Sequence, residues 1–399
     1  MSHGKPRGPI RVSRAVQIPD PVRLERYRHT PELGPRVLFF SGGSGLRAVS
    51  RKIIEYTHHS RHIITPFDSG GSSAKLRRAF RMPAVGDLRN RLMALADQTV
   101  LGNPEIYELF KFRFPDEGTQ DDLVRWLGRM VRGRDPLVQA VPEPMRTLVR
   151  NHIGFFQSAM PEGFDLRGAA IGNLVLAGGY LNQGRTLDPV LYLFSQLVEV
   201  RGVVRPVVDR DLHLVAELDD GREIVGQHRF TGRGDEALPA PIRRVYLSRS
   251  RRRPTPVRPP VPEAVEELIR NADLICFPVG SFYSSVVATL LPDGVADAIA
   301  ETDVPKVYVP NPGHDPEELG LELGDKVERL VDVLRRGTSR RPRTDQLLDF
   351  VLLDPCSFTK KEIRRVRAAG IQVLETPLVD ARSKRVEPVA LVEALLSLA

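Results

Sequence analysis

Two glycine-rich stretches carry the residues best suited to chemistry in this chain. The first, "SGGSGL" at residues 41–46, follows a short apolar run and precedes apolar residues at helical spacing. The second, "FDSGGSSAKLRR" at residues 67–78, follows another short apolar run. A glycine loop between a buried strand and a helix lets backbone N–H groups converge on an anion, most often a phosphate. A tight turn that binds nothing is the alternative interpretation.

Asp68 is the one carboxylate inside either loop. In a parallel sheet with right-handed crossovers, both loops emerge at the same carboxyl edge and can form a floor for a diphosphate. Asp68 follows Gly45 by about twenty residues, the spacing at which dinucleotide-binding folds keep a ribose-binding acid. The same carboxylate can instead hold a Mg²⁺ ion that bridges phosphates. The spacing leaves both roles open.

The elements that must position these loops alternate between apolar runs and helical stretches. This alternation is typical of an α/β fold with a doubly wound, mostly parallel, Rossmann-like sheet. Residues 211–230 alternate and turn at Asp219-Asp220-Gly221, which predicts an antiparallel hairpin at a sheet edge. The apolar runs taken as strands are "HIITPF" (62–67), "NLVLAGGYL" (173–181), "DLICFPVG" (273–280), "KVYVPN" (306–311), "DFVLLD" (349–354) and "IQVLETP" (371–377).

The domain organisation predicted from these patterns is simple. Residues 1–34 are basic and proline-dotted, which indicates an extended N-terminal arm, and residues 35–399 form a single nucleotide-binding domain. Residues 104–165 show helical spacing and are interpreted as a helical insertion that could overhang the site. Residues 344–399 are expected to close the sheet as strand–helix–strand–helix. The segment around Lys384 is expected to lie far from the glycine loops.

Composition narrows the class of protein. The 399 residues are 41% hydrophobic, carry a net charge of +8 and include two cysteines, too few for a disulfide scaffold or a thiolate metal site. No long apolar stretch and no signal-peptide core is found, so a cytoplasmic protein without a membrane partner is expected. Basic clusters at Arg249–Arg253 and Arg335–Arg343 lack interleaved aromatic residues. Solvated loops are therefore the default for both clusters, and nucleic acid is an unlikely partner.

Residues 67–97 contain a glycine–serine motif followed by "GDLRN" (86–90). This stretch closely resembles the gluconeogenesis factor (YvcK-type) family, which is related to the 2-phospho-L-lactate transferases (CofD) that build a deazaflavin coenzyme. The resemblance continues collinearly to the C-terminus. It includes "SGGSGL" (41–46), "FKFRF" (110–114), "IGNLVLAG" (171–178), "PVGSFYSS" (278–285) and "KVYVPNPG" (306–313).

The resemblance implies a nucleotide in the crevice at the carboxyl ends of the strands. Some of these residues also have a purely structural interpretation. Gly280 can be a helix-entry glycine, Ser281 can be the N-cap of that helix, and Asp87 can be a helix cap. Asp68 would hold Mg²⁺, and Asp87 is the candidate general base. The implied binding groups are Gly42, Gly43, Ser44, Gly45, Asp68, Ser69, Gly70, Gly71, Ser72, Gly86, Asp87, Arg89 and Asn90, with Asn173, Gly280, Ser281 and Asn311 at later strand ends.

Departures from the family pattern keep two functions open. Val279-Gly280 replaces a proline–glycine pair, His314-Asp315 is inserted after Asn311, and the transferase's acidic N-T-G-D-D motif is absent. One hypothesis is an enzyme that transfers a phosphoryl-linked group from a nucleotide diphosphate donor to an acceptor hydroxyl with Mg²⁺. The ionisable residues after Asn311 favour this hypothesis. The alternative is a non-catalytic regulator that binds a nucleotide-sugar. A homodimer is expected in either case.

Overall fold

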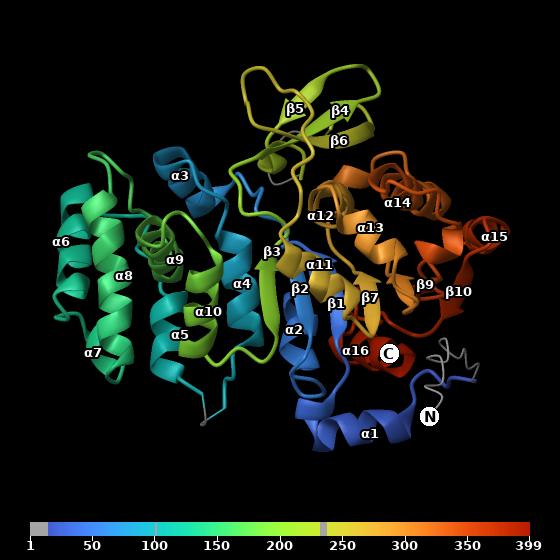
Figure 1. Ribbon diagram of the computed structural model, residues 1–399, viewed down its shortest axis with the longest axis horizontal. Helices are drawn as coiled ribbons and strands as arrows, with labels where there is room; N and C mark the ends of the chain where they lie inside the picture. The colour runs from blue at the N-terminus through green and yellow to red at the C-terminus, as the bar shows by residue number, and fades with distance from the viewer. Residues whose placement is uncertain (1–14, 100–101, 232–237) are drawn as a thin grey trace, which may run out of the picture.

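A seven-stranded parallel sheet runs through the computed structural model, which describes residues 15–99, 102–231 and 238–399 (Figure 1). The predicted doubly wound α/β sheet is therefore confirmed. Along the chain the sheet begins at β1 (Val37–Ser41), the fifth of the seven strands in spatial order, and grows outward to the nearer edge. It later resumes at β7 (Leu274–Phe277) and builds the other side. This reversal puts the topological switch point between β1 and β7. In spatial order the strands are β10 (Gln372–Glu375), β9 (Phe350–Leu353), β8 (Lys306–Tyr308), β7 (Leu274–Phe277), β1 (Val37–Ser41), β2 (Arg61–Ile64) and β3 (Val203–Pro206).

Every side chain of β1 is buried, because helices cover both faces of the sheet. Val37 and Phe39 pack into one core, whereas Leu38 and Phe40 pack into the core on the other face. The first core includes side chains of α2 (Arg47–Ile53), α4 (Gly86–Leu95) and α16 (Pro388–Leu398). The second includes side chains of α11 (Glu263–Arg270), the π-helix η3 (Phe282–Val287), α12 (Ala288–Leu290), α13 (Val295–Ala300), α14 (Leu323–Gly337) and α15 (Lys360–Ala368).

A helical body lies beside the sheet and connects β2 to β3 (Figure 1). The helical spacing expected in residues 104–165 is confirmed as four helices. Figure 1 shows most of this body at the side of the sheet, away from the glycine loops. The helices are α3 (Gly71–Phe80), α4, α5 (Pro104–Lys111), α6 (Gln120–Val131), α7 (Pro136–Ala140), α8 (Met145–Ala159), α9 (Ile171–Asn182) and α10 (Asp188–Leu197).

The prediction of a strand at "NLVLAGGYL" is wrong, because this stretch lies within α9. Ten of the twelve residues of α9 are buried, so the helix is apolar on every side and shows no amphipathic period. A side chain at Gly178 would overlap the backbone carbonyl of His152 in α8. The glycines therefore allow the buried helix α9 to pack closely against α8. A short apolar run does not distinguish such a helix from a buried strand.

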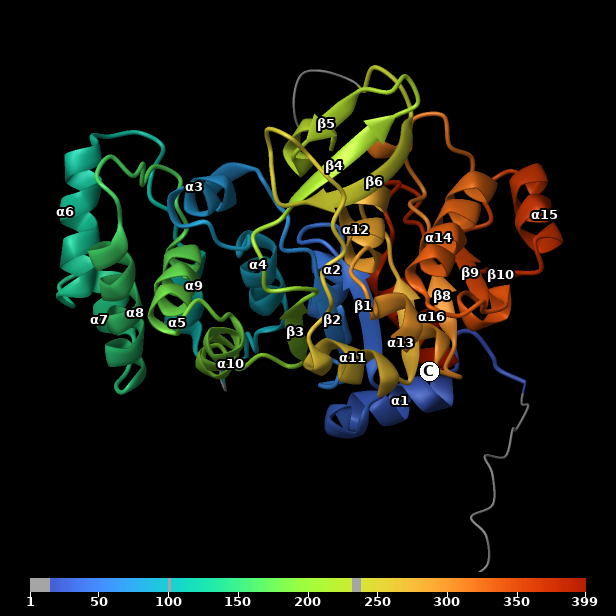
Figure 2. The same cartoon turned by 45° about the horizontal axis from the view of Figure 1, so that its top comes forward.

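The predicted hairpin is confirmed, and it belongs to a separate small sheet. β4 (His213–Leu218) pairs antiparallel with β5 (Glu223–Val225) and with β6 (Ile242–Ser248). Both views show this sheet above the large one, near α12 (Figure 1, Figure 2). The hairpin thus covers the fold instead of extending the edge of the large sheet.

The prediction of an extended N-terminal arm is wrong for residues 21–33. They form α1 (Pro21–His29) and the 3₁₀-helix η1 (Pro31–Leu33), and residues 1–14 lie outside the described residues. Asp20 accepts a hydrogen bond from the backbone N–H of Arg23 and caps α1. The backbone N–H of Asp20 donates to Ser397 Oγ at 2.8 Å. These contacts dock α1 against the C-terminal helix α16.

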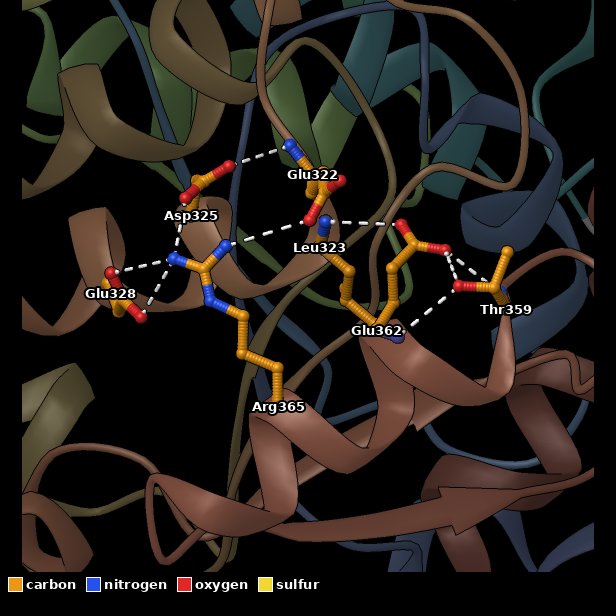
Figure 3. Close-up of polar contacts among 7 residues, drawn as sticks. All are labelled: Glu322, Leu323, Asp325, Glu328, Thr359, Glu362 and Arg365. Atoms are coloured by element: carbon orange, nitrogen blue, oxygen red, sulfur yellow. Dashed lines mark hydrogen bonds and ion pairs between the residues drawn. The ribbon is translucent and has the colours of Figure 1, made fainter.

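The C-terminal segment contains β9, α15, β10 and α16, the expected order of elements. Arg365 on α15 forms ion pairs with Asp325 at 2.6 Å and Glu328 at 3.0 Å, both on α14 (Figure 3). Its side chain passes directly over Gly324, where a Cβ would overlap it. These contacts hold α15 against α14 at the β10 end of the fold. Among the described residues, none of the helices has the length and apolar character that crossing a bilayer requires.

Candidate functional site

The first glycine loop contacts the chain just beyond β7 at backbone distance. A Cβ at Gly45 would lie 2.9 Å from the Cα of Gly280, so this close approach excludes a side chain at position 45. Gly280 itself has a φ of +144°, a conformation that favours glycine. Asn311, beyond β8, accepts a hydrogen bond from Gly280 N at 2.9 Å and donates to Gly280 O at 2.7 Å. The ends of β1, β7 and β8 are thereby locked together.

The carboxylate of Asp87 fills the space beside the same loop. Asp87 lies in the first turn of α4, whose N-cap is Val85, so it is not the N-cap residue. A Cβ at Gly43 would overlap the Asp87 carboxylate, and a Cβ at Gly42 would overlap the hydroxyl of Ser285. The glycines of "SGGSGL" thus make room for a carboxylate at the crevice.

A buried arginine supports the loop from behind. Arg91 is fully buried on α4, and its Nη2 donates to Gly42 O at 2.8 Å and to Ser41 Oγ at 3.2 Å. Its Nη1 donates to the hydroxyl of Ser50 on α2. Burial lowers the pKa of Arg91 to about 10, whereas the charge of Asp87 acts in the opposite direction. The guanidinium stays charged at neutral pH and places a positive charge beneath the loop.

The second glycine loop begins α3 and is fixed by its own side chains. Asp68 Oδ1 accepts a hydrogen bond from Gly70 N at 3.0 Å. Ser69 Oγ lies 2.7 Å from His228 Nδ1, on the 3₁₀-helix η2 (Gln227–Arg229) that follows the small sheet's hairpin. Asn173 Nδ2 donates to Ser72 Oγ at 2.9 Å. Asn173 therefore meets the site from the first turn of α9, and the prediction that it lies at a strand end is wrong.

A large cavity opens over the first loop at the topological switch point, as expected for this class of sheet. Its volume is about 710 Å³, within the range of small-molecule sites. Four cations line it, namely Arg47 and Arg51 on α2 and Lys384 and Arg385 before α16. The predicted residues that line this larger cavity are Gly43, Ser44, Gly45, Asp68, Asp87, Gly280, Ser281 and Asn311.

A second cavity of about 440 Å³ lies over the second loop and shares lining residues with the first. Asp68, Asp87, Gln227 and Thr231 line both cavities. The two carboxylates therefore stand at the junction of a two-part site. The remaining predicted residues that line the second cavity are Gly70, Gly71, Ser72, Gly86, Arg89, Asn90 and Asn173.

The second cavity contains buried polar atoms that lack a protein partner. Arg89 is 6% exposed, and neither its Nε nor its Nη1 has a hydrogen-bond partner among the described residues. The same holds for Asn173 Oδ1 and Gln227 Oε1. Burial, followed by the charges of Arg113 and Arg47, lowers the pKa of Arg89 to about 10. A buried cation with unused donors is suited to an anionic or hydroxyl-bearing ligand group.

The acidic residues after Asn311 have a structural role. Asp315 Oδ2 accepts from Phe282 N at 3.0 Å, and Glu317, in the 3₁₀-helix η4 (Pro316–Glu318), accepts from the backbone N–H groups of Tyr283 and Ser284. These carboxyl groups cap η3, and the side chain of Ser281 makes no capping hydrogen bond. Asp315 is therefore committed to the fold, which removes its support for chemistry, and the first N–H groups of η3 are unavailable to a phosphate.

Two predicted residues line neither of these cavities. They are Gly42, whose carbonyl accepts from the buried Arg91, and Ser69, which contacts His228 and lines a different cavity. The expectation that Lys384 is remote is wrong, because it lines the larger cavity. From the region interpreted as a helical insertion, Arg113 alone among described residues lines either cavity. Sequence reasoning missed Arg47, Arg51, Arg91, Arg113, Gln227, His228, Thr231, Ser285, Lys384 and Arg385. Arg113 and Ser285 lie within the family-like stretches 110–114 and 278–285, which were a signal that could have found them.

The junction suits Mg²⁺ better than a closed metal site. Among the described residues, no group of three or more histidine, cysteine, aspartate and glutamate side chains is placed to hold a metal. Asp68 and Asp87 supply two carboxylates, and Mg²⁺ is usually held by one or two carboxylates together with phosphate oxygens and water. The donor set present therefore fits a Mg²⁺ ion that arrives with a phosphorylated ligand.

Known proteins resemble the chain in both sequence and fold. A putative gluconeogenesis factor from Deinococcus radiodurans is 29% identical over 386 residues, which cover 93% of this chain and 67% of the relative. The gluconeogenesis factor of Bacillus subtilis is 26% identical over 355 residues, covering 86% of this chain and 91% of the relative. The chain thus spans about two thirds of the length of the Deinococcus protein.

A solved structure shares the fold. The crystal structure of a UPF0052 family protein from Bacillus halodurans has a TM-score of 0.65 and 24% identity, and the match covers 91% of this chain and 99% of that one. The model of the family described as 2-phospho-L-lactate transferase CofD matches residues 37–394, from β1 into α16. The glycine loops, both cavities and the strand ends that line them all fall within this match, and the chain belongs to the 2-phospho-L-lactate transferase CofD family.

Proposed function

We propose that the protein is a transferase that moves a phosphoryl-linked group from a nucleotide diphosphate donor to an acceptor hydroxyl. The observation that carries the proposal is the pair of cavities that meet at Asp68 and Asp87. A protein that only binds a nucleotide needs one cavity. A transferase needs a donor site and an acceptor site with reactive groups at their junction.

The donor would occupy the larger cavity. Gly43, Ser44 and Gly45 of the first loop line it, and Arg47, Arg51, Lys384 and Arg385 add positive charge around it. The fully buried charge of Arg91 lies beneath the loop, where it is screened less than an exposed charge. Fixed dipoles and cations of this kind stabilise charge on a transferring phosphate without reorganisation.

The acceptor would occupy the second cavity, where Arg89 and Asn173 offer unused polar atoms. In the reaction, the acceptor oxygen forms a bond to the distal phosphorus of the diphosphate, which belongs to the transferred group. The bond from that phosphorus to the bridging oxygen breaks, and a nucleoside monophosphate leaves. Asp87 would take the proton from the acceptor hydroxyl. Mg²⁺, held by Asp68, would neutralise charge on the phosphate oxygens.

The test is the release of nucleoside monophosphate. The full chain is incubated with Mg²⁺, a panel of nucleotide-sugar and nucleotide-phosphoacyl donors, and cell extract as the source of acceptor. Release is expected in the wild type and is expected to fall at least a hundredfold in Asp68→Asn and in Asp87→Asn. Asp121→Asn, an exposed residue in the first turn of α6, is the matched control and should retain full activity.

A second candidate is a regulator that binds a nucleotide-sugar without turnover. Two observations favour it: the relatives carry the name gluconeogenesis factor, and the acids after Asn311 are bound to backbone N–H groups. Tight binding of one donor with no monophosphate release across the whole panel would establish the regulator and overturn the transferase.

A further inference from the structure

A third cavity lies between the end of α3 and the small sheet, apart from the two cavities already described. Its volume is about 340 Å³. We call it the basic cavity, and its lining consists of Ser69, Ala74, Arg77, Arg78, Arg81, Asp211, His213, Arg249 and Arg251. Residues 249–251 belong to the basic cluster after β6, and Arg77, Arg78 and Arg81 lie at the end of α3. Two basic runs that are distant in sequence thus meet at one hollow.

Positive charges outnumber negative charges around the basic cavity. Asp211 is its only lining carboxylate among the described residues, and it is bound by Arg77 Nη2 at 2.6 Å and Nε at 3.1 Å. The other four arginines form no ion pair with any described residue. His213 adds no charge at neutral pH, because burial, followed by the charges near it, lowers its pKa to about 4. Four cations around one hollow repel one another unless an anion joins them.

Stabilisation of the helix end explains only part of this arrangement. Cations near a helix C-terminus interact favourably with the macrodipole, which accounts for Arg78. Arg81 is the C-cap residue and has a φ of +49°, a left-handed conformation in which glycine is the usual residue. A side chain there costs on the order of 1 kcal/mol. Arg249 and Arg251 follow β6, so the macrodipole of α3 does not explain why they lie at this cavity.

One wall of the basic cavity is rigid and adjoins the second glycine loop. Arg77 is 6% exposed, and its Nη1 donates to Phe67 O and to Asp68 O, each at 3.0 Å. Ser69, which also lines the cavity, contacts His228 through its hydroxyl. The side chains that can move toward a ligand are the exposed ones, Arg78, Arg81, Arg249 and Arg251.

We propose that the basic cavity is a second anion site that binds a compact, multiply charged phosphate such as diphosphate. Guanidinium groups match phosphate oxygens in bidentate geometry, and several of them together suit an anion with more than one charge. A nucleic-acid surface fits less well, because among the described residues no phenylalanine, tyrosine or tryptophan lines the cavity for base stacking. A cavity of this volume also accommodates a small anion better than a nucleic-acid strand.

The test is calorimetric titration of the full chain with inorganic diphosphate. Arg249→Ala/Arg251→Ala removes two lining cations, whereas Arg252→Ala/Arg253→Ala removes two exposed cations of the same loop that do not line the cavity. Both double variants lower the net charge equally. Diphosphate affinity is expected to fall at least tenfold in the first and less than twofold in the second. The titrations are made in an Arg47→Ala/Arg51→Ala background, which weakens binding in the larger cavity.

Arg81→Gly separates loss of binding from loss of folding. Glycine suits the left-handed C-cap, so this variant is expected to unfold at the same or a higher temperature while binding diphosphate more weakly.

Equal diphosphate affinity in the two double variants would overturn the proposal. Loss of binding to a labelled 20-nucleotide strand in Arg249→Ala/Arg251→Ala, with diphosphate binding unchanged, would also overturn it and identify a nucleic-acid surface. Because the donor site is a different cavity, failure of one proposal leaves the other standing.

Discussion

No side chain fits at position 43, because the carboxylate of Asp87 already occupies the space where a Cβ would stand. Gly43→Ala is therefore expected to displace Asp87 and to weaken binding of nucleoside diphosphates in the larger cavity at least tenfold. Calorimetry with a panel of nucleoside diphosphates measures the effect, and circular dichroism checks the fold. Gly154→Ala is the control, since its Cβ would make an ordinary 3.6 Å contact with Val131. Wild-type affinity in Gly43→Ala would contradict the placement of the donor.

At the scale of single residues, glycine loops and carboxylates were predictable and most cations were not. Glycines 43, 45 and 280 could be predicted because each position demands this residue type. A carboxylate fills the Cβ space at Gly43, a backbone fills it at Gly45, and Gly280 has a positive φ. Arg91 lies in a stretch whose local pattern indicates an ordinary helix, and Lys384 lies in one whose pattern indicates an ordinary basic turn. Their roles arise from tertiary contacts, Arg91 beneath Gly42 and Lys384 at the cavity wall. No local pattern distinguishes such arginines and lysines from solvated ones.

The capping of η3 by η4 predicts how stability depends on pH. Burial, followed by the charge of Asp315, raises the pKa of Glu317 to about 8. The folded protein then keeps a proton that the unfolded chain releases above pH ~4.5. The free energy of unfolding should therefore fall as the pH rises from about 4.5 to 8, by up to ~1.4 kcal/mol per pH unit for this group, and then level off.

Urea denaturation at intervals from pH 5 to pH 9 measures this dependence. Glu317→Gln cannot ionise, so its curve should be flatter than that of the wild type over the same range. The exposed Glu105→Gln, in the first turn of α5, should follow the wild type. A wild-type stability that rises across this window would show that Glu317 is ionised in the folded protein.

At the scale of elements, the glycine-punctuated strands could be predicted and the fully buried helix could not. β1, β2 and β7 are followed within four residues by Gly42, Asp68 and Gly280, and their carboxyl ends meet as parallel strands must. α9 is equally apolar, and its glycines serve packing against α8 instead of a turn. α1 was missed because its nine residues include one buried side chain, Leu24. Docking on α16, more than amphipathic character, holds that helix in place.

At the scale of the whole molecule, two properties can be measured directly: whether the protein retains a ligand and whether it forms a dimer. We expect the purified protein to retain a nucleotide and to form a homodimer. Native mass spectrometry reports both at once, as a species at twice the chain mass with added ligand mass. Arg47→Ala/Arg51→Ala should lose the added mass and keep the dimer, because both residues face the larger cavity. A monomer free of nucleotide would contradict both expectations.

The order of strands in the large sheet also bears on synthesis at the ribosome. β1 is among the first elements to emerge, yet its neighbour β7 lies more than two hundred residues later in the chain. Until then one edge of β1 has no partner, and an open apolar edge invites wrong pairing. Gly280 and Asn311, which hold the first glycine loop, emerge later still. The proposed donor site is therefore incomplete until residue 311 has been made, and we expect ligand binding only after most of the polypeptide has emerged.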